Sequence, residues 1–96
     1  MLVNDEKLGV RTIRVGQELG KITVFVPRQV EEGDYECRLS ISIGDQNKES
    51  RVVGIDGIQA VQLAFRRAEA ILNALTKESC DEVSWLDMPG SGLASL

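Results

Sequence analysis

Histidine is absent from this chain of 96 residues, and cysteine occurs only twice. Without an imidazole base, neither a cysteine nor a serine can be activated in the usual way, so Cys–His and Ser–His catalytic sites are excluded. Two cysteines are too few for a disulfide scaffold, and we predict that Cys37 and Cys80 are free thiols. Cys37 is expected in the core, and Cys80 follows a predicted helix end, where the dipole disfavours a thiolate.

Aromatic residues and long apolar runs are also scarce. The four aromatic residues leave valine, isoleucine, leucine and alanine to fill most of the core. No apolar run approaches the ~20 residues that a membrane span needs, and residues 1–6 lack the basic and apolar regions of a signal peptide. We therefore expect a cytoplasmic protein without membrane contact.

Basic residues are outnumbered, because 11 Lys and Arg face 15 Asp and Glu, for a net charge of -4. This balance argues against binding to a phosphate backbone, so no nucleic-acid partner is expected. Strand alternation is expected to spread the arginines of the sheet region among acidic neighbours; these are Arg11, Arg14, Arg28, Arg38 and Arg51.

The strongest pattern in the chain is a helical one in its second half. Apolar residues recur at intervals of three and four, which predicts one buried stripe: Ile58, Val61, Phe65, Ala68, Leu72 and Leu75. Asp56 is suited to cap the helix, and Gln59 completes a pair that resembles a capping box. The pattern therefore predicts a helix over residues 56–76.

The first half of the chain predicts strands over residues 8–15, 21–27, 35–43 and 50–55. The clearest is Tyr35–Ile43, in which Tyr35 and alternate apolar residues face one side while Glu36 and alternate polar residues face water. Predicted turns over residues 16–20 and 44–49, and a charged loop over 28–33, connect the strands. Because every connection is short, the strands should form an antiparallel meander.

These patterns predict a single domain of the α+β class over residues 1–96. Its four-stranded antiparallel meander sheet is covered on the apolar face by one long C-terminal helix. We divide the chain into a frayed start (1–7), the sheet (8–55), the helix (56–76) and a tail (77–96) that Trp85 anchors against the sheet or the helix end.

Three motifs together carry a family resemblance: Tyr35-Glu36-Cys37, the segment from Gly54 to Ala64, and Trp85-Leu86. They resemble a family of short bacterial proteins classed as a domain of unknown function. In that family a Tyr-x-Cys strand precedes a Gly-Val-Asp-x-Ile-Gln-Ala-Leu helix start and a late tryptophan. The resemblance spans residues 35–93, and Gly57 departs from it. It implies a small α+β fold and brings no reaction, ligand or catalytic residue.

Two acidic clusters are the remaining candidates for chemistry: Glu31, Glu32 and Asp34 in one, Asp81 and Glu82 in the other. Paired carboxylates can act as acid and base or bind a hard cation. Neither cluster lies in a glycine-rich or hydrophobic setting that would tune a pKa, so both are interpreted as solvated turns. We predict no catalytic, cofactor-binding or metal-binding residues, and no cofactor.

The outer face of the helix offers a possible partner surface. Gln62, Arg66 and Glu69 lie three and four residues apart, off the buried stripe, and form one polar face. Such a face is either a solvated surface or a docking surface for a partner.

The sequence favours a non-enzymatic protein-interaction or regulatory module. Its partner is an unknown protein or a second copy that pairs through an edge strand. A specific version is an immunity or antitoxin-like protein, whose acidic charge would mask a basic partner. Two alternatives remain: a small-molecule- or metal-binding protein with carboxylate chemistry, and a self-associating structural unit with an apolar tail over residues 93–96.

Overall fold

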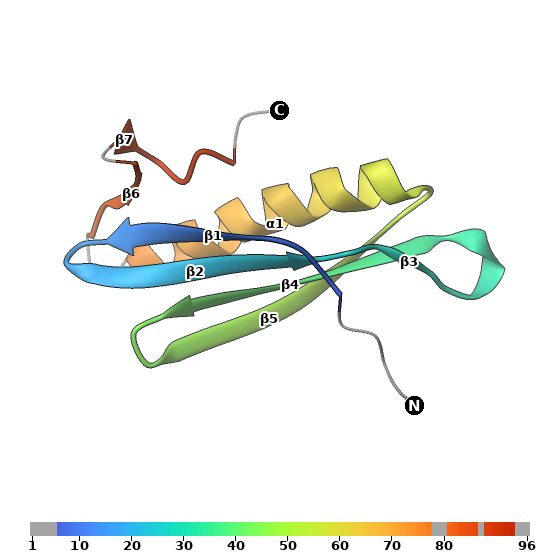
Figure 1. The fold of residues 1–96 in the computed structure, drawn as a ribbon, viewed down its shortest axis with the longest axis horizontal. Helices are drawn as coiled ribbons and strands as arrows, with labels where there is room; N and C mark the ends of the chain where they lie inside the picture. Colours follow the sequence, from blue (N-terminus) through green and yellow to red (C-terminus); the bar gives the residue numbers. More distant parts are fainter. Residues whose placement is uncertain (1–5, 78–80, 87, 94–96) are drawn as a thin grey trace.

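The structure, a computed structural model, describes residues 6–77, 81–86 and 88–93 (Figure 1). One antiparallel sheet carries a single long helix on one face, which confirms the α+β class. The elements in chain order are β1 (Lys7–Val15), β2 (Glu18–Phe25), β3 (Arg28–Gln29), a 3₁₀ turn (Glu31–Gly33), β4 (Tyr35–Ile43), β5 (Gln46–Gly54), α1 (Gly57–Lys77), β6 (Val83–Trp85) and β7 (Met88–Pro89).

The sheet contains seven strands among the described residues rather than the four predicted. The four long strands do form the expected meander, with the spatial order β5-β4-β2-β1. The additional strands are β3, which pairs with β4, β6, which pairs with β1, and β7, which pairs with β6. Each has two or three residues, too few for an alternating pattern to be visible in the sequence.

Both long hairpins turn more tightly than predicted. β1 and β2 are connected by Gly16-Gln17, and β4 and β5 by Gly44-Asp45. Residues 46–49, predicted as loop, instead belong to β5 and pair with residues 40–43 of β4. Their polar composition hid this strand, because β5 is an edge strand whose side chains at this end are exposed.

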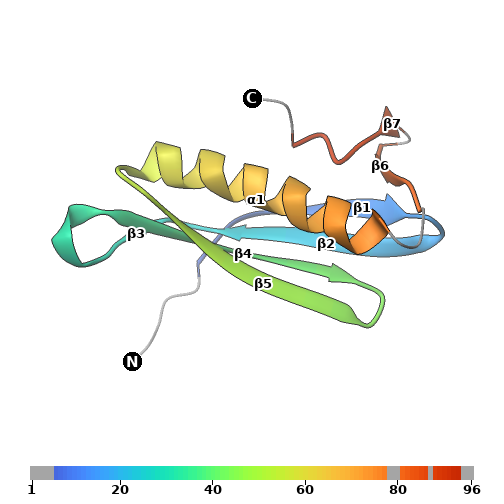
Figure 2. The ribbon, with the colours of Figure 1, turned by 180° about the vertical axis from the view of Figure 1, so that it is seen from behind.

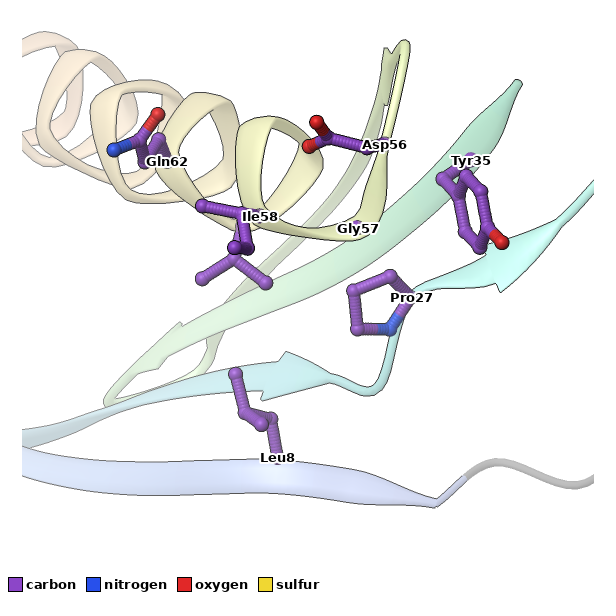
Figure 3. A pocket seen from close by; sticks show the side chains of 8 residues that line it. Leu8, Pro27, Tyr35, Asp56, Gly57, Ile58 and Gln62 are labelled. Carbon is purple, nitrogen blue, oxygen red and sulfur yellow. The ribbon is translucent and has the colours of Figure 1, made fainter. Parts of the chain in front are cut away.

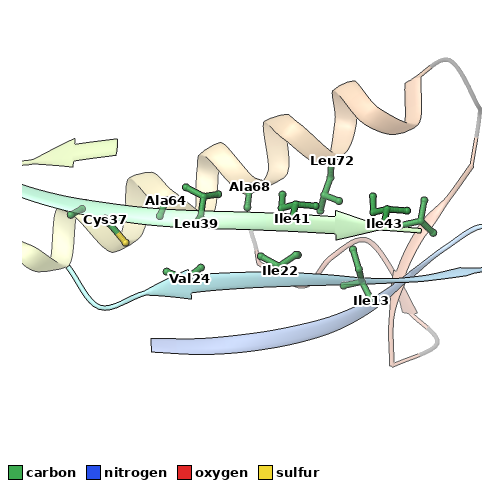
Figure 4. Packing of buried hydrophobic residues seen from close by; sticks show 12 residues of the cluster. Ile13, Ile22, Val24, Cys37, Leu39, Ile41, Ile43, Ala64, Ala68 and Leu72 are labelled. Carbon is green, nitrogen blue, oxygen red and sulfur yellow. The ribbon is translucent and has the colours of Figure 1, made fainter. Parts of the chain in front are cut away.

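The core lies between α1 and the covered face of the sheet (Figure 4). Cys37 is fully buried in it, as predicted. The buried apolar residues are Ile13, Val15, Ile22, Val24, Cys37, Leu39, Ile41, Ile43, Ala60, Ala64, Ala68 and Leu72.

The helix is rotated about its axis relative to the predicted stripe. Ala60, Ala64 and Ala68, which we call the alanine seam, are fully buried, whereas Ile58 is 74% exposed. Small residues let the helix approach β4 and β5 closely: a Cβ on Gly54 would lie 2.7 Å from the Ala60 nitrogen. The prediction for Ile58 was wrong because the stripe followed the bulky residues of the first turns and left out Ala60 and Ala64, which bring the helix backbone close to the sheet.

The helix begins as predicted, with Asp56 preceding Gly57 at its first turn. The Asp56 carboxylate accepts a 2.7 Å hydrogen bond from the Gln59 backbone N–H. In return the Gln59 side-chain oxygen accepts a 2.8 Å hydrogen bond from the Ile55 N–H. This reciprocal pair satisfies two backbone donors and fixes the path of the chain from β5 into α1.

Glu36 lies on the face of β4 predicted to be wet, yet it is only 4% exposed. Arg51 donates to one carboxylate oxygen at 2.5 Å, and Arg28 lies 3.1 Å from the other. The hydrogen bond from Arg51 lowers the pKa of Glu36; burial opposes this shift and Arg28 adds to it. The prediction of a solvated Glu36 was wrong because it did not allow for arginines reaching over it from β3 and β5.

Most of the arginines gather on one face of the sheet, where Arg28 and Arg51 have Glu36 as an acidic neighbour. In the strand register, four of the five share the uncovered face of the sheet: Arg14, Arg28, Arg38 and Arg51. Alternation alone could not reveal this, because the face on which each residue lies depends on how neighbouring strands are aligned.

The tail returns from the end of α1 to the free side of β1 (Figure 2). Trp85 packs against the core, and the Arg11 guanidinium lies 3.7 Å from the centre of its ring. Arg11 also donates to the Ser91 carbonyl at 3.2 Å. The tail therefore covers the part of β1 that lies nearest the β1–β2 hairpin.

Candidate functional site

An apolar groove runs between the first turns of α1 and strand β1 (Figure 3). One wall comes from α1, and Leu8 on β1 faces it from the other side. The residues that line this part are Leu8, Pro27, Tyr35, Asp56, Gly57, Ile58, Val61 and Gln62.

A second hollow shares Leu8 with the first and continues along the helix. Ile22 and Val24 of β2 line it, together with Phe65 of α1 and Leu93. We call the two hollows together the α1–β1 groove. Leu93 belongs to the tail, so the tail contributes to this groove as well.

The groove exists because one helix is narrower than the sheet it covers. The alanine seam seats α1 over β4 and β5, with few contacts to β2. A register irregularity between Lys7 and Gly9 makes Leu8 an extra residue in β1, and such a bulge re-aims a side chain. As a result Leu8 is 50% exposed beside Ile58, although both are large and apolar.

The outer backbone edge of β1 lies next to this groove. Among the described residues, only β6 pairs with this edge, and it does so at Arg14 and Val15 alone. The stretch from Lys7 to Ile13 therefore presents backbone groups without a neighbouring strand in the described part of the chain. A free edge beside an apolar groove is the arrangement that binds an extended peptide as an added strand.

The predicted partner surface is divided by the structure. Gln62 lies at the groove, whereas Arg66 lines a different hollow between α1 and β5. Glu69 accepts a hydrogen bond from the Ser91 hydroxyl and so contacts the tail. Of the three residues, only Gln62 lies at the α1–β1 groove.

Cys37, which was also considered for chemistry, does not line the groove. Cys37 donates from its thiol to the Phe25 carbonyl at 3.3 Å, and burial raises the pKa of this thiol to about 11. Cys80 lies outside the described residues. In the described part of the chain, no three Cys, Asp or Glu side chains come together in a set that could hold a metal ion.

Within the described residues, α1 does not combine the length and apolar character that a membrane-crossing helix requires. It is amphipathic, with its apolar side on the sheet.

Sequence reasoning missed most of the groove, because its residues come from segments that are far apart in the chain. Leu8, Pro27 and Tyr35 meet Ile58 only after the sheet and helix are assembled. One signal was available: the alanines at positions 60, 64 and 68 fix which side of the helix is buried, and this leaves Ile58 outside.

The model of the family DUF6968, a domain of unknown function, matches residues 10–95. The chain therefore belongs to this family, and the resemblance inferred from the three motifs is confirmed. No curated protein and no solved structure matches the chain.

Proposed function

We propose that this protein is a non-enzymatic interaction module that binds an extended apolar segment of another protein. The segment adds to the free edge of β1, and its inward side chains enter the α1–β1 groove. The single observation that carries this proposal is an open apolar groove directly beside the stretch of β1 from Lys7 to Ile13, whose outer edge pairs with no strand among the described residues.

The exposure of Leu8 and Ile58 supports this use. Neither side chain is buried by the chain itself, and clustered exposed apolar side chains mark interaction sites. Burying both on binding would contribute roughly 1 to 3 kcal/mol each. The groove has few polar groups, among them Asp56 and Gln62 at its helix side, and these would fix the orientation of the bound segment.

Catalysis is not the better interpretation of this groove. Among the described residues that line it, Asp56 alone carries a carboxylate, and the Gln59 N–H already donates to this group. Carboxylate chemistry or metal binding would need a second acidic group in the groove. We place the protein in the bacterial cytoplasm, in keeping with the expectation from its sequence.

Affinity capture from a native lysate tests the proposal with three baits. These are the wild type, Ile58→Asp in the groove, and Leu86→Asp, which is 70% exposed in the β6–β7 turn, as a matched control. Aspartate suits both positions. Position 58 lies in the first turn of α1, where the helix dipole favours an acidic side chain. Position 86 has a positive φ of 53°, which aspartate adopts more readily than most residues.

We expect a partner that is recovered near one-to-one by the wild type and Leu86→Asp but reduced about tenfold with Ile58→Asp, a loss equivalent to about 1.4 kcal/mol. Equal recovery by all three baits would contradict the proposal. A wild-type dimer that Ile58→Asp dissociates would also contradict it, because the occupant would then be a second copy.

A further inference from the structure

The uncovered face of the sheet carries a charge opposite to that of the whole chain. Six basic residues and two carboxylates of the described residues share this open face by strand register: Lys7, Arg14, Lys21, Arg28, Arg38 and Arg51, with Glu36 and Glu49. Its formal charge is therefore +4 on a chain of net charge -4, so the remainder of the sequence carries -8.

Part of this positive charge is not neutralised within the described residues. Glu36 is held by Arg28 and Arg51, which leaves those three groups with one net positive charge. On the neighbouring strands, Lys7, Arg14 and Lys21 are exposed, and no ion pair among the described residues involves them. Lys7, Arg14 and Lys21 therefore remain available to an anionic partner from outside the chain.

Hydroxyl groups lie between the basic side chains. Thr12 is the register partner of Lys21 on β2, and Lys21 in turn is the partner of Ser42 on β4. Thr23 and Ser40 are also register partners on this face. Lysine, arginine and hydroxyl groups all donate hydrogen bonds, so the open face presents a field of donors suited to oxyanions.

The anion that suits this face is a carboxylate rather than a nucleic-acid phosphate. Single-stranded nucleic acid binds on exposed aromatic rings, and the one described aromatic ring on this face belongs to Phe25. Its ring lies under the Arg38 guanidinium, with 4.9 Å between the two. A long polyanion would also extend past the patch, where the remaining -8 of the chain repels it.

We propose that the open face docks an acidic segment of a protein, with carboxylates contacting Arg14, Lys21 and the hydroxyls between them. This inference does not rest on the groove, because α1 and the open face are on opposite sides of the sheet. Attraction between opposite charges steers an acidic partner toward the open face, and this attraction weakens as salt screens the charges.

Fluorescence anisotropy with a labelled oligoglutamate peptide of about twelve residues tests the proposal, because the peptide supplies carboxylates that can accept hydrogen bonds from the basic and hydroxyl side chains of the open face. The double variant Arg14→Glu/Lys21→Glu removes the patch. The control Arg66→Glu/Lys77→Glu changes the net charge equally but lies on exposed positions of α1. The single variant Ile58→Asp separates this surface from the groove.

We expect about tenfold weaker peptide binding by the open-face variant, and less than about a twofold change for both the α1 control and Ile58→Asp. Binding by the wild type should also weaken several-fold as salt rises from about 50 to about 500 mM. Equal weakening by the α1 control would overturn the proposal, as would no wild-type binding. Tighter binding to an oligothymidylate of equal length would overturn it as well and would assign the face to nucleic acid.

Discussion

Along the side of α1 that lies on β4 and β5, alanines at every fourth position bring helix and sheet backbones close together. Along the side that faces β1, larger residues line an open groove. Ile58 of the helix remains exposed there, as does Leu8 on β1. Both sides are apolar and belong to one helix. The alanine seam has small side chains and packs on β4 and β5, whereas the groove side of the helix has larger side chains and faces β1.

The difference separates the two roles that apolar residues have in this protein. In the seam, apolar surface is buried within the chain and stabilises the fold. In the groove, Leu8 and Ile58 keep half or more of their surface in water, and this exposed part stabilises the fold little until a partner covers it. Substitutions should therefore affect stability on one side and binding on the other.

The largest effect should come from Gly54→Ala, which breaks the close approach at the seam. The added Cβ would lie 2.7 Å from the Ala60 backbone nitrogen, so α1 must shift. We expect a loss of about 3 kcal/mol in the free energy of unfolding, measured by urea denaturation. Gly9→Ala in β1 is the matched control, because nothing lies within 4 Å of its Cβ. An equal loss in the free energy of unfolding for both variants would contradict the claim that close packing at the alanine seam stabilises the fold.

A smaller effect on stability is expected for Glu36→Gln. This variant tests whether the ion pairs on the open face of the sheet stabilise the fold. Glu36 is buried under Arg28 and Arg51, and we expect a loss of about 1 to 2 kcal/mol at neutral pH. Urea denaturation measures this loss, and Glu49→Gln on β5 is the control.

The loss should depend on pH. Because the pKa of Glu36 is lowered on folding, its stabilising effect is present above the ordinary value of 4.5 and disappears as pH falls through the lowered value. The difference between wild type and Glu36→Gln should therefore shrink in acid. A difference that stays constant down to about pH 3 would contradict this role.

Asp56 lies where the seam and the groove meet, and it should matter to the fold. Asp56→Ala removes the acceptor for the Gln59 N–H and is expected to lower the free energy of unfolding by about 1 kcal/mol. Asp56→Asn keeps an acceptor oxygen and should lose less in the same thermal or urea melt. An alanine variant as stable as the wild type would show that the cap is dispensable.

The smallest effect on stability should come from Ile58→Asp in the groove. Ile58 is exposed, so we expect a change below about 0.5 kcal/mol. Leu72→Ala, on the buried side of the same helix, should lose about 3 kcal/mol by comparison. A loss of similar size for Ile58→Asp would mean that the groove belongs to the core and is not a binding surface.

The strands and helix that repeat a clear pattern were predictable from the sequence. Tyr35–Ile43 alternates without interruption, and the helix start carries its cap in Asp56 and Gln59, so both were placed well. Residues 46–49 were not, because both sides of an edge strand tolerate polar side chains at its exposed end. Two- and three-residue strands such as β6 carry no periodic signal.

The candidate sites were less predictable, because both depend on contacts between distant segments. Leu8 meets the helix only through a bulge in β1 and the offset position of α1. The basic face likewise requires the register that aligns Arg14 and Lys21 with the other strands. Local spacing says which residues alternate, and it does not say which strands lie side by side.

Selection from a displayed library of random peptides tests the central claim most directly, with wild type, Ile58→Asp and Leu86→Asp as targets. We predict that wild type and Leu86→Asp enrich the same peptides, with apolar residues at alternate positions as an added strand requires. These peptides should bind Ile58→Asp about tenfold more weakly. Peptides that bind all three targets equally, or an enriched set without alternation, would contradict strand addition at the α1–β1 groove.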